Sequence, residues 1–290
     1  MLFAGDSYFY IGRGHFEAGK PCQDYALAGT NGRAAYAIVS DGCSTGGKTD
    51  VGARILALST AKTLGHTAVR AIAEPVTDVL PEISVRQRLV VTCSQEILGL
   101  SQSDILATCV YCYFTPQGGY IHLEGDGVIA LRWRDKHIRM YRYEWEDNRP
   151  CYPAFAQDHF AGFIQEHGGD LAAQKLTQEI WDYAPGDTGC RLISETHISL
   201  WEGIRGVRIP IAKEELDLLD CVAVFTDGVA QVEGIDWKEA VVECLAFKVV
   251  AGEFVKRRLI RFIKDVQKKG KGPLDDIACA AIRMIPEEVK

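Results

Sequence analysis

The chain has 290 residues, of which 47% are apolar, and it carries a formal net charge of −7. This length and composition suffice for one large α/β domain or two small ones, with a full hydrophobic core that needs no disulfides. The negative charge and the lack of a basic stripe argue against a nucleic-acid-binding protein and against a protein that binds a membrane surface.

The N-terminal sequence and the cysteines indicate a cellular compartment. Residues 1–19 lack the charged start and the long apolar core of a signal peptide, and no transmembrane span is predicted. Ten cysteines are present, and several fall inside predicted strands or helices as small buried side chains. Cys109 and Cys112 lie in one predicted strand and point to opposite faces, so they do not predict a zinc site. We therefore expect a protein of the reducing cytoplasm.

The first half of the chain predicts strands, then two helices, then a strand meander. Three apolar or alternating runs are typical of strands: residues 8–18, 24–29 and 35–40. Two stretches with apolar residues on one face predict helices: residues 46–65 and 85–100. Four strands joined by tight turns follow: residues 107–114, 120–123, 128–134 and 137–143. Consecutive strands joined by tight turns predict mostly antiparallel sheets.

The second half begins with a polar, weakly patterned segment, residues 144–205, which we interpret as a variable insertion beside the site. We expect one helix in it, near residues 171–183. Four regular elements follow, a strand, two helices and a last strand: residues 218–225, 237–250, 253–268 and 277–285. Each helix pair would cover one sheet. The predicted fold is therefore α+β, a four-layer α-β-β-α sandwich of two mostly antiparallel sheets flanked by helix pairs, with residues 1–290 as one domain.

Acidic residues recur at the ends of the predicted strands. Six aspartates share this position: Asp24, Asp41, Asp126, Asp227, Asp275 and Asp276. Asp41 and Asp227 each follow a buried strand and precede a glycine, and Asp126 stands between two glycines. Carboxylates on rigid strand ends suit a hard divalent cation, which prefers carboxylate and water oxygens. One Asp-Gly pair alone would more often be an ordinary strand end, so the recurrence is what predicts a metal site.

Short motifs around these aspartates occur in the order of a known family. They are CQDYA, VSDGCSTGG with a following GARILALS helix, ATC, GDG, FTDG and DDIA. From about Gly14 to Ile285 the chain resembles the metal-dependent serine/threonine protein phosphatases of the 2C type. Its first motif, His15 followed by Gly-Lys-Pro-Cys-Gln-Asp, is most similar to a bacterial subgroup of that family.

The resemblance implies a reaction and a metal centre. Phosphoserine and phosphothreonine would be hydrolysed by a water that bridges two Mn²⁺ or Mg²⁺ ions. Asp41 would bridge both ions, with the Gly42 carbonyl on one of them. Asp227 and Asp275 would complete the other site, and these three aspartates would be the catalytic set. Around the ions, or at a third ion, the resemblance places four further residues: Gln23, Asp24, Asp126 and Asp276.

The chain departs from the family pattern at several of these positions. Gln23 stands where many members have Glu, and Gly19 stands where the phosphate-binding arginine of the family would fall. Three nearby cations remain open as substitutes for that arginine: Arg13, His15 and Lys20. Gln231 replaces the usual partner of Asp126 at a third ion, and Cys43 stands where animal members have a histidine.

The expected partner is a phosphorylated protein, the product of a serine/threonine kinase in a signalling pathway, and neither nucleic acid nor a membrane. Two other hypotheses stay open. One is a pseudophosphatase that binds a phosphoprotein without turnover, which Gln23 and the missing arginine suggest. The other is a hydrolase of small phosphorylated molecules, because a fold alone does not fix the substrate. The intact set of Asp41, Asp227 and Asp275 argues against the pseudophosphatase.

Overall fold

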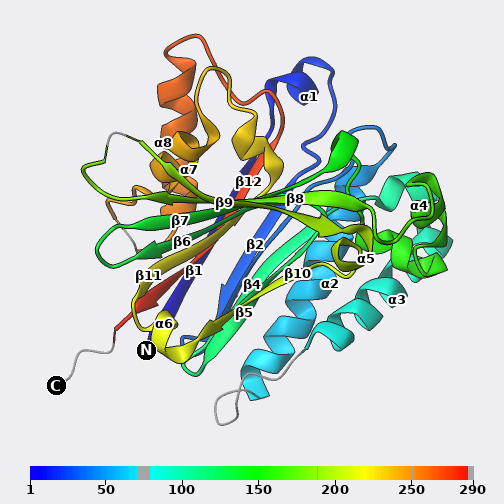
Figure 1. The fold of residues 1–290 in the computed structure, drawn as a ribbon, viewed down its shortest axis with the longest axis horizontal. Helices are drawn as coiled ribbons and strands as arrows, with labels where there is room; N and C mark the ends of the chain where they lie inside the picture. Colours follow the sequence, from blue (N-terminus) through cyan, green and yellow to red (C-terminus); the bar gives the residue numbers. More distant parts are fainter. Residues whose placement is uncertain (71–78, 188, 250, 287–290) are drawn as a thin grey trace.

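The computed structural model describes residues 1–70, 79–187, 189–249 and 251–286. Its strands form two sheets in which every neighbouring pair of strands is antiparallel (Figure 1). The seven-stranded sheet runs in the order β1 (Leu2–Tyr10), β12 (Ile277–Ile285), β11 (Leu219–Phe225), β6 (Gly127–Trp133), β7 (Ile138–Trp145), β8 (Gln174–Tyr183) and β9 (Arg191–Ser199). The five-stranded sheet runs in the order β10 (Val207–Ala212), β5 (Gly118–Glu124), β4 (Cys109–Thr115), β3 (Ala35–Ser40) and β2 (Tyr25–Thr30).

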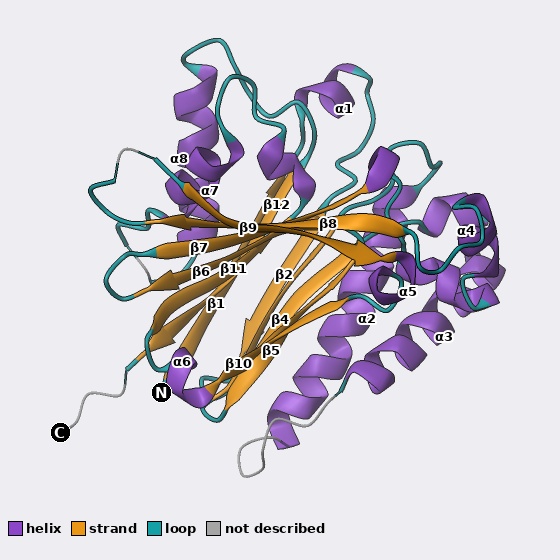
Figure 2. Ribbon diagram, in the orientation of Figure 1, coloured by secondary structure: helices purple, strands orange, loops and turns teal. Residues whose placement is uncertain are grey.

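Two helix pairs cover the outer faces of the sheets (Figure 2). α2 (Thr49–Arg70) and α3 (Leu80–Leu98) pack on the five-stranded sheet, where Leu64 and Ile83 meet Ile38 in one buried cluster. α7 (Trp237–Leu245) and α8 (Phe254–Gln267) pack on the seven-stranded sheet through a second cluster. A third cluster fills the space between the sheets. The predicted four-layer α+β fold is confirmed.

The strands in the middle of the sandwich are buried on both faces, which explains their composition. All seven residues of β11, Leu-Asp-Cys-Val-Ala-Val-Phe, are buried, and so are five of the six residues of β3. Such strands lose the polar alternation of a half-exposed strand and become continuous apolar runs. α8 instead buries one face only, with Val255, Leu259 and Val266 inward and lysines and arginines outward.

Several predicted elements differ from the structure, and the sequence pattern does not predict β9 or β10. The strand expected at residues 8–18 is the end of β1 followed by the short helix α1 (Arg13–Glu17). The helix expected near residues 171–183 is wrong, because Gln174–Tyr183 is strand β8, which pairs with β7 on one side and β9 on the other. Its Leu, Gln and Glu residues favour a helix locally, but pairing with β7 and β9 overrides that preference. The helix expected at residues 237–250 ends at Leu245, and Val250 lies outside the described residues.

Residues 144–205 contain more regular structure than their composition suggested. β8 and β9 extend the seven-stranded sheet beyond β7, and four short helices accompany them: η2 (Glu146–Asn148), η3 (Pro153–Asp158), α4 (Ala161–Glu166) and α5 (Leu200–Gly203). The remaining short helices of the described chain are η1 (Gln102–Ile105), α6 (Lys213–Leu216) and η4 (Asp227–Ala230). In the described ranges no helix has the length and apolar character that crossing a membrane requires.

Candidate active site

Antiparallel pairing gathers the strand-end aspartates at one edge of the sandwich. In the five-stranded sheet Asp24 precedes β2 and Asp41 follows β3, and these strands pair from Tyr25 opposite Ser40. In the seven-stranded sheet β6 begins, β11 ends and β12 begins at the same edge, which places Asp126, Asp227 and the pair at 275–276 close together. The Thr226 hydroxyl at the end of β11 donates to Asp24 Oδ2 at 2.6 Å and so ties the two groups to each other.

Two glycines explain why the Asp-Gly pair recurs. A Cβ on Gly42 would lie 2.6 Å from the backbone oxygen of Thr49, and a Cβ on Gly228 would lie 1.7 Å from that of Asp276. Both contacts are closer than real Cβ atoms come, so only glycine permits the neighbouring backbone to approach. Each glycine therefore fixes the position of the aspartate that precedes it.

Asp24 and Asp41 form the most tightly coupled part of the cluster. Asp24 is buried, and the two carboxyl groups hydrogen-bond to each other. Burial raises the pKa of both aspartates well above the ordinary value, and for Asp41 the charges of Asp24 and Asp227 raise it further. Thr108, from the ATC motif, holds the Asp41 backbone through its hydroxyl oxygen, which accepts the Asp41 N–H at 3.0 Å.

Asp126 and Asp227 show the same electrostatic stress. Burial raises the pKa of Asp126 well above its ordinary value, and the charge of Asp227 adds to the shift. Burial and the charge of Asp275 raise the pKa of Asp227 to about 6. Gln231 Nε2 donates to Asp227 Oδ2 at 2.9 Å and to Asp275 Oδ2 at 3.3 Å. One amide thus bridges two carboxylates that the sequence predicts as metal ligands.

Asp276 is fully embedded in backbone donors. Its Oδ1 accepts the Gly12 N–H at 2.7 Å, and its Oδ2 accepts the Gln23 N–H at 2.6 Å. His15 Nδ1 lies 2.9 Å from Asp276 Oδ2 without hydrogen-bond alignment, and 3.7 Å from Asp275 Oδ1. His15, Asp275 and Asp276 each offer a ligand atom, and these three atoms lie within 4.8 Å of one another.

The donor set fits hard divalent cations. Among the described residues, the side chains of Asp24, Asp41, Asp126 and Asp227 find their hydrogen bonds in hydroxyl, amide and carboxyl groups and none in a lysine or arginine. Gln23 Nε2 donates to the Thr49 hydroxyl at 2.7 Å, which leaves its buried Oε1 without a hydrogen-bond partner. Crowded, buried carboxylates with raised pKa values and an unused amide oxygen are what bound Mn²⁺ or Mg²⁺ would relieve.

The side chains of the three predicted phosphate-binding candidates have different partners. Arg13 is exposed and its Nη1 lies 3.2 Å from Glu233 Oε2, while Lys20 Nζ donates to the Ser44 carbonyl at 3.4 Å. His15 is buried beside Asp275 and Asp276, as described above. Gly19 has a φ of +66°, a conformation that disfavours the arginine of the family at this position.

The sequence did not single out Arg142, which faces the cluster. Arg142 lies opposite Val128 in the pairing of β7 with β6, and Val128 is two residues after Asp126 in the sequence. A cavity of about 260 Å³ contains Arg142 together with Asp126, Asp227 and Gln231. Nothing in the order of residues marks this arginine, because only the register of the two strands brings it to the GDG turn.

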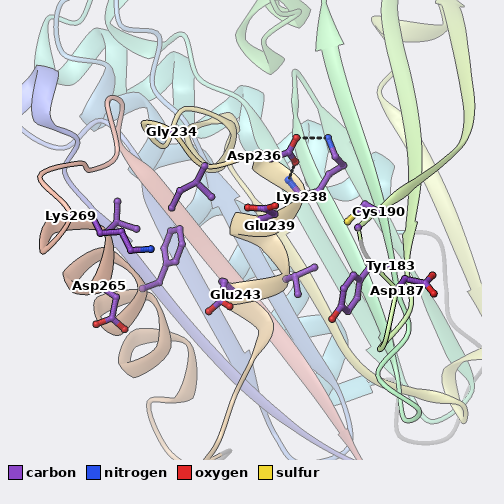
Figure 3. Close-up of a pocket in the computed structure, with 15 residues that line it drawn as sticks. Tyr183, Asp187, Cys190, Gly234, Asp236, Lys238, Glu239, Glu243, Asp265 and Lys269 are labelled. Atoms are coloured by element: carbon purple, nitrogen blue, oxygen red, sulfur yellow. Dashed lines mark hydrogen bonds and ion pairs between the residues drawn. The ribbon is translucent and has the colours of Figure 1, made fainter.

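A larger cavity, of about 760 Å³, lies elsewhere, between α7, α8 and the loop that joins β8 to β9 (Figure 3). It contains none of the predicted site residues. Three of its acidic residues have ion-pair partners: Asp236 pairs with Lys238, Glu243 with Arg258, and Asp265 with Arg261 and Lys268. The chemistry of the chain is therefore expected at the smaller cavity.

Comparisons with known proteins bear on the family and the fold. Residues 11–151 match the protein phosphatase 2C family model, and no curated protein matches the chain. Among solved structures, the serine/threonine phosphatase Stp1 from Staphylococcus aureus has a TM-score of 0.52 at 10% identity, over 99% of this chain and 96% of that one. A bacterial serine phosphatase has a TM-score of 0.53 at 9% identity, over 99% of this chain and 100% of that one. Residues 11–151 thus match the model of the protein phosphatase 2C family, and the chain as a whole has the fold of these solved phosphatases.

Proposed function

We propose that this protein is a metal-dependent phosphoprotein phosphatase that hydrolyses phosphoserine and phosphothreonine. The observation that carries the proposal is the convergence of buried aspartates from both sheets at one edge, without lysine or arginine partners for their carboxylates. A protein does not collect such charges for stability, because each buried carboxylate costs free energy. The family match and the serine/threonine phosphatases of the same fold support the same reaction.

Four residues would hold two Mn²⁺ or Mg²⁺ ions. Asp41 would contact both ions, the Gly42 carbonyl would contact one, and Asp227 and Asp275 would complete the site. When bound, the ions would lower the pKa of a water molecule and screen the charge of the phosphate. The Gln231 amide, which stands where a third acidic ligand would be needed beside Asp126, favours two ions over three.

The other residues of the cluster would position these ligands. Asp276 fastens the first motif to β12 through the N–H groups of Gly12 and Gln23, which keeps Asp24 and Asp275 on neighbouring backbones. Thr226 holds Asp24 in one orientation. A rigid surrounding of this kind keeps carboxylates at a fixed separation, as metal chemistry requires.

We further assign residues 1–290 to one catalytic domain in the bacterial subgroup with the GxPCQD motif, acting in the cytoplasm on a protein that a serine/threonine kinase has phosphorylated. Residues 144–205 would influence the choice of substrate. Support for this comes from Tyr152 in that segment, which is hydrogen-bonded to Cys43 beside Asp41.

Turnover of p-nitrophenyl phosphate with Mn²⁺ and after exhaustive chelation tests the proposal, together with calorimetric Mn²⁺ titration. We expect activity that depends on Mn²⁺ or Mg²⁺, and weaker binding of mainly one ion in Asp227→Asn and in Asp275→Asn. Gln23→Glu adds a charge near one ion and should tighten it. Full activity after chelation would contradict the metal-dependent reaction, and Mn²⁺ binding without turnover of any phosphopeptide would identify a pseudophosphatase.

A further inference from the structure

The cavity of about 260 Å³ beside Asp126 and Asp227 has an unusual charge distribution. Its walls come from the GDG turn, from β7 and the residues after it, and from η4. Asp126, Asp227 and Glu144 contribute negative charge, and Arg142 is the one cationic side chain among the described residues that line it. A cationic side chain beside a site built from carboxylates is a candidate for binding an anionic ligand.

Arg142 is held in place on two sides. Its Nη2 lies 3.0 Å from Glu144 Oε2, and its guanidinium carbon lies 5.9 Å from the centre of the Trp237 ring, near the outer limit of a cation–π contact. The side chain is 26% exposed. A guanidinium has five N–H donors, and among the described residues Glu144 is its only ion-pair partner, so most of these donors remain available.

The guanidinium is also electrically close to the aspartates without pairing with them. Burial raises the pKa of Asp126 and of Asp227, and the charge of Arg142 opposes both shifts. Neither carboxylate lies within ion-pair distance of Arg142 among the contacts of the described chain. The arginine therefore faces the open cavity at short range from the proposed metal ligands.

We propose that Arg142, with the Asn148 side chain across the same cavity, forms the subsite that binds the oxygens of a phosphate monoester dianion. The proposal rests on the phosphatase function above, since the ions would supply the other contacts to the phosphate. It gives the chain the planar, two-pronged donor that phosphate recognition favours. The arginine that the family has near the N-terminus, and that Gly19 cannot replace, is thereby supplied from β7.

The three cations of the first motif are poorer candidates in this arrangement. Arg13 pairs with Glu233, and Lys20 donates to the Ser44 carbonyl. His15 is buried, with its Nδ1 beside Asp275 and Asp276. None of the three lines the cavity that Asp126 and Asp227 share.

The test is calorimetric binding of inorganic phosphate to the Mn²⁺-loaded protein, a measurement that needs no turnover. Arg142→Ala should weaken phosphate binding by about 10- to 100-fold, the range expected for charge-assisted hydrogen bonds. Arg142→Lys keeps the charge but loses the fork and should fall between wild type and Arg142→Ala. Mn²⁺ should bind Arg142→Ala at least as tightly as wild type, because the variant lacks a positive charge that would repel Mn²⁺.

Arg139→Ala is the matched control. Arg139 lies on the same strand, on its other face, and its guanidinium pairs with Asp182. This variant should bind phosphate like the wild type. Melting curves of all variants with Mn²⁺ show whether each is folded, and Arg142→Lys keeps the question open to test if Arg142→Ala does not fold.

Several outcomes overturn the subsite. One is wild-type phosphate affinity in both Arg142 variants, and another is an equal loss in Arg139→Ala. Phosphate that fails to bind the Mn²⁺-loaded wild type also overturns it, and so does a loss in Arg13→Ala, His15→Ala or Lys20→Ala that Arg142→Ala does not share. If phosphate binds through Arg142 but no phosphate ester is hydrolysed, the proposed function fails while the subsite stands.

Discussion

Two aspartates, one near the start of strand β11 and one just after its end, have opposite surroundings. Asp220, near its start, is almost fully buried and is surrounded by cations: Arg132 at 2.6 Å, Lys136 at 3.4 Å and Arg283. Asp227, just after its end, has a glutamine as its hydrogen-bond partner, and the charge of Asp275 acts on it more strongly than that of Arg142. The same residue type at the two ends of one strand thus meets opposite signs of charge.

The pKa values follow this difference. Burial alone would raise the pKa of Asp220, but the hydrogen bond from Arg283 and the charges of Arg132 and Arg283 outweigh it and lower the pKa below the ordinary value. Around Asp227 burial and like charges act in the same direction and raise the pKa to about 6. Asp220 is therefore a structural carboxylate whose charge is balanced by paired cations, whereas no lysine or arginine of the described chain pairs with Asp227 or with the aspartates Asp24, Asp41 and Asp126 near it. That deficit indicates a site for cations.

The largest effect should come from Asp41→Asn, which removes one charge from the aspartate cluster around Asp227. We expect Mn²⁺-dependent turnover to fall by more than about 100-fold, beyond the loss typical of residues that only orient metal ligands. The same change should raise the melting temperature of the metal-free protein, because it relieves repulsion between buried carboxylates. Steady-state kinetics, calorimetric Mn²⁺ titration and melting in chelator measure the three effects. Two ions bound with wild-type affinity would show that Asp41 does not bridge them.

Asp220→Asn should have the opposite profile. Removing the partner of the buried Arg132 should lower the free energy of unfolding by about 3 kcal/mol, the lower end of the range for breaking a buried ion pair. Mn²⁺ affinity should not change, because the substitution lies at the far end of β11. Urea denaturation in chelator measures the loss. Asp265→Asn, at an exposed ion pair on α8, is the control and should leave the free energy of unfolding almost unchanged.

Much of the aspartate cluster around Asp227 could be predicted from the sequence, whereas the ion-pair cluster around Asp220 could not. The aspartates stand beside glycines at strand ends, and that local pattern is visible without a structure. Asp220 stands inside an apolar run, and its partners Arg132 and Arg283 are 88 and 63 residues away. Only the pairing of β11 with β6 and β12 brings them together.

The same limit applies to Arg142 and to β8. Arg142 reaches the site because β7 pairs with β6 in one particular register, and a slip of one residue would turn it to the other face. Gln174–Tyr183 has residues that suit a helix, and its strand conformation depends on neighbours at the sheet edge. Long-range pairing decided both, whereas β2 to β7, β11, β12 and the four long helices followed from local apolar patterns.

The two clusters should also respond oppositely to pH. For Asp24, Asp41, Asp126 and Asp227 the pKa in the folded protein is raised, so the folded state binds protons more tightly than the unfolded state. The stability of the metal-free protein should then fall as pH rises from about 4 through 6, whereas the contribution of Asp220 is lost only as pH falls below about 4.

Melting temperatures in chelator and in Mn²⁺ measure this prediction. In chelator the melting temperature should be about 5 °C lower at pH 7.5 than at pH 5, since a shift of the size seen at Asp227 alone is worth a few kcal/mol. Mn²⁺ binds deprotonated carboxylates and should therefore raise the melting temperature more at pH 7.5 than at pH 5. Asp41→Asn should flatten the pH dependence in chelator, and a steeper dependence would contradict the assignment of the raised pKa values to this cluster.

The smallest effect should come from substituting Cys43, which tests whether the aspartate cluster around Asp227 needs a thiol in addition to cations. Cys43 follows Asp41 by two residues, and its Sγ lies 3.2 Å from the Thr45 hydroxyl. Burial alone would raise the pKa of this thiol, but hydrogen bonds from Thr45, Tyr152 and two backbone N–H groups outweigh it and lower the pKa. A thiol of this kind could act as a nucleophile.

If the nucleophile is water, Cys43→Ala should keep turnover of p-nitrophenyl phosphate within about 2-fold of wild type, the effect of losing one modest contact. Cys22→Ala, at a thiol whose pKa burial and neighbouring aspartates raise, is the control and should behave alike. Loss of turnover in Cys43→Ala alone, with two Mn²⁺ ions still bound by calorimetry, would transfer the chemistry from the carboxylates to the thiol.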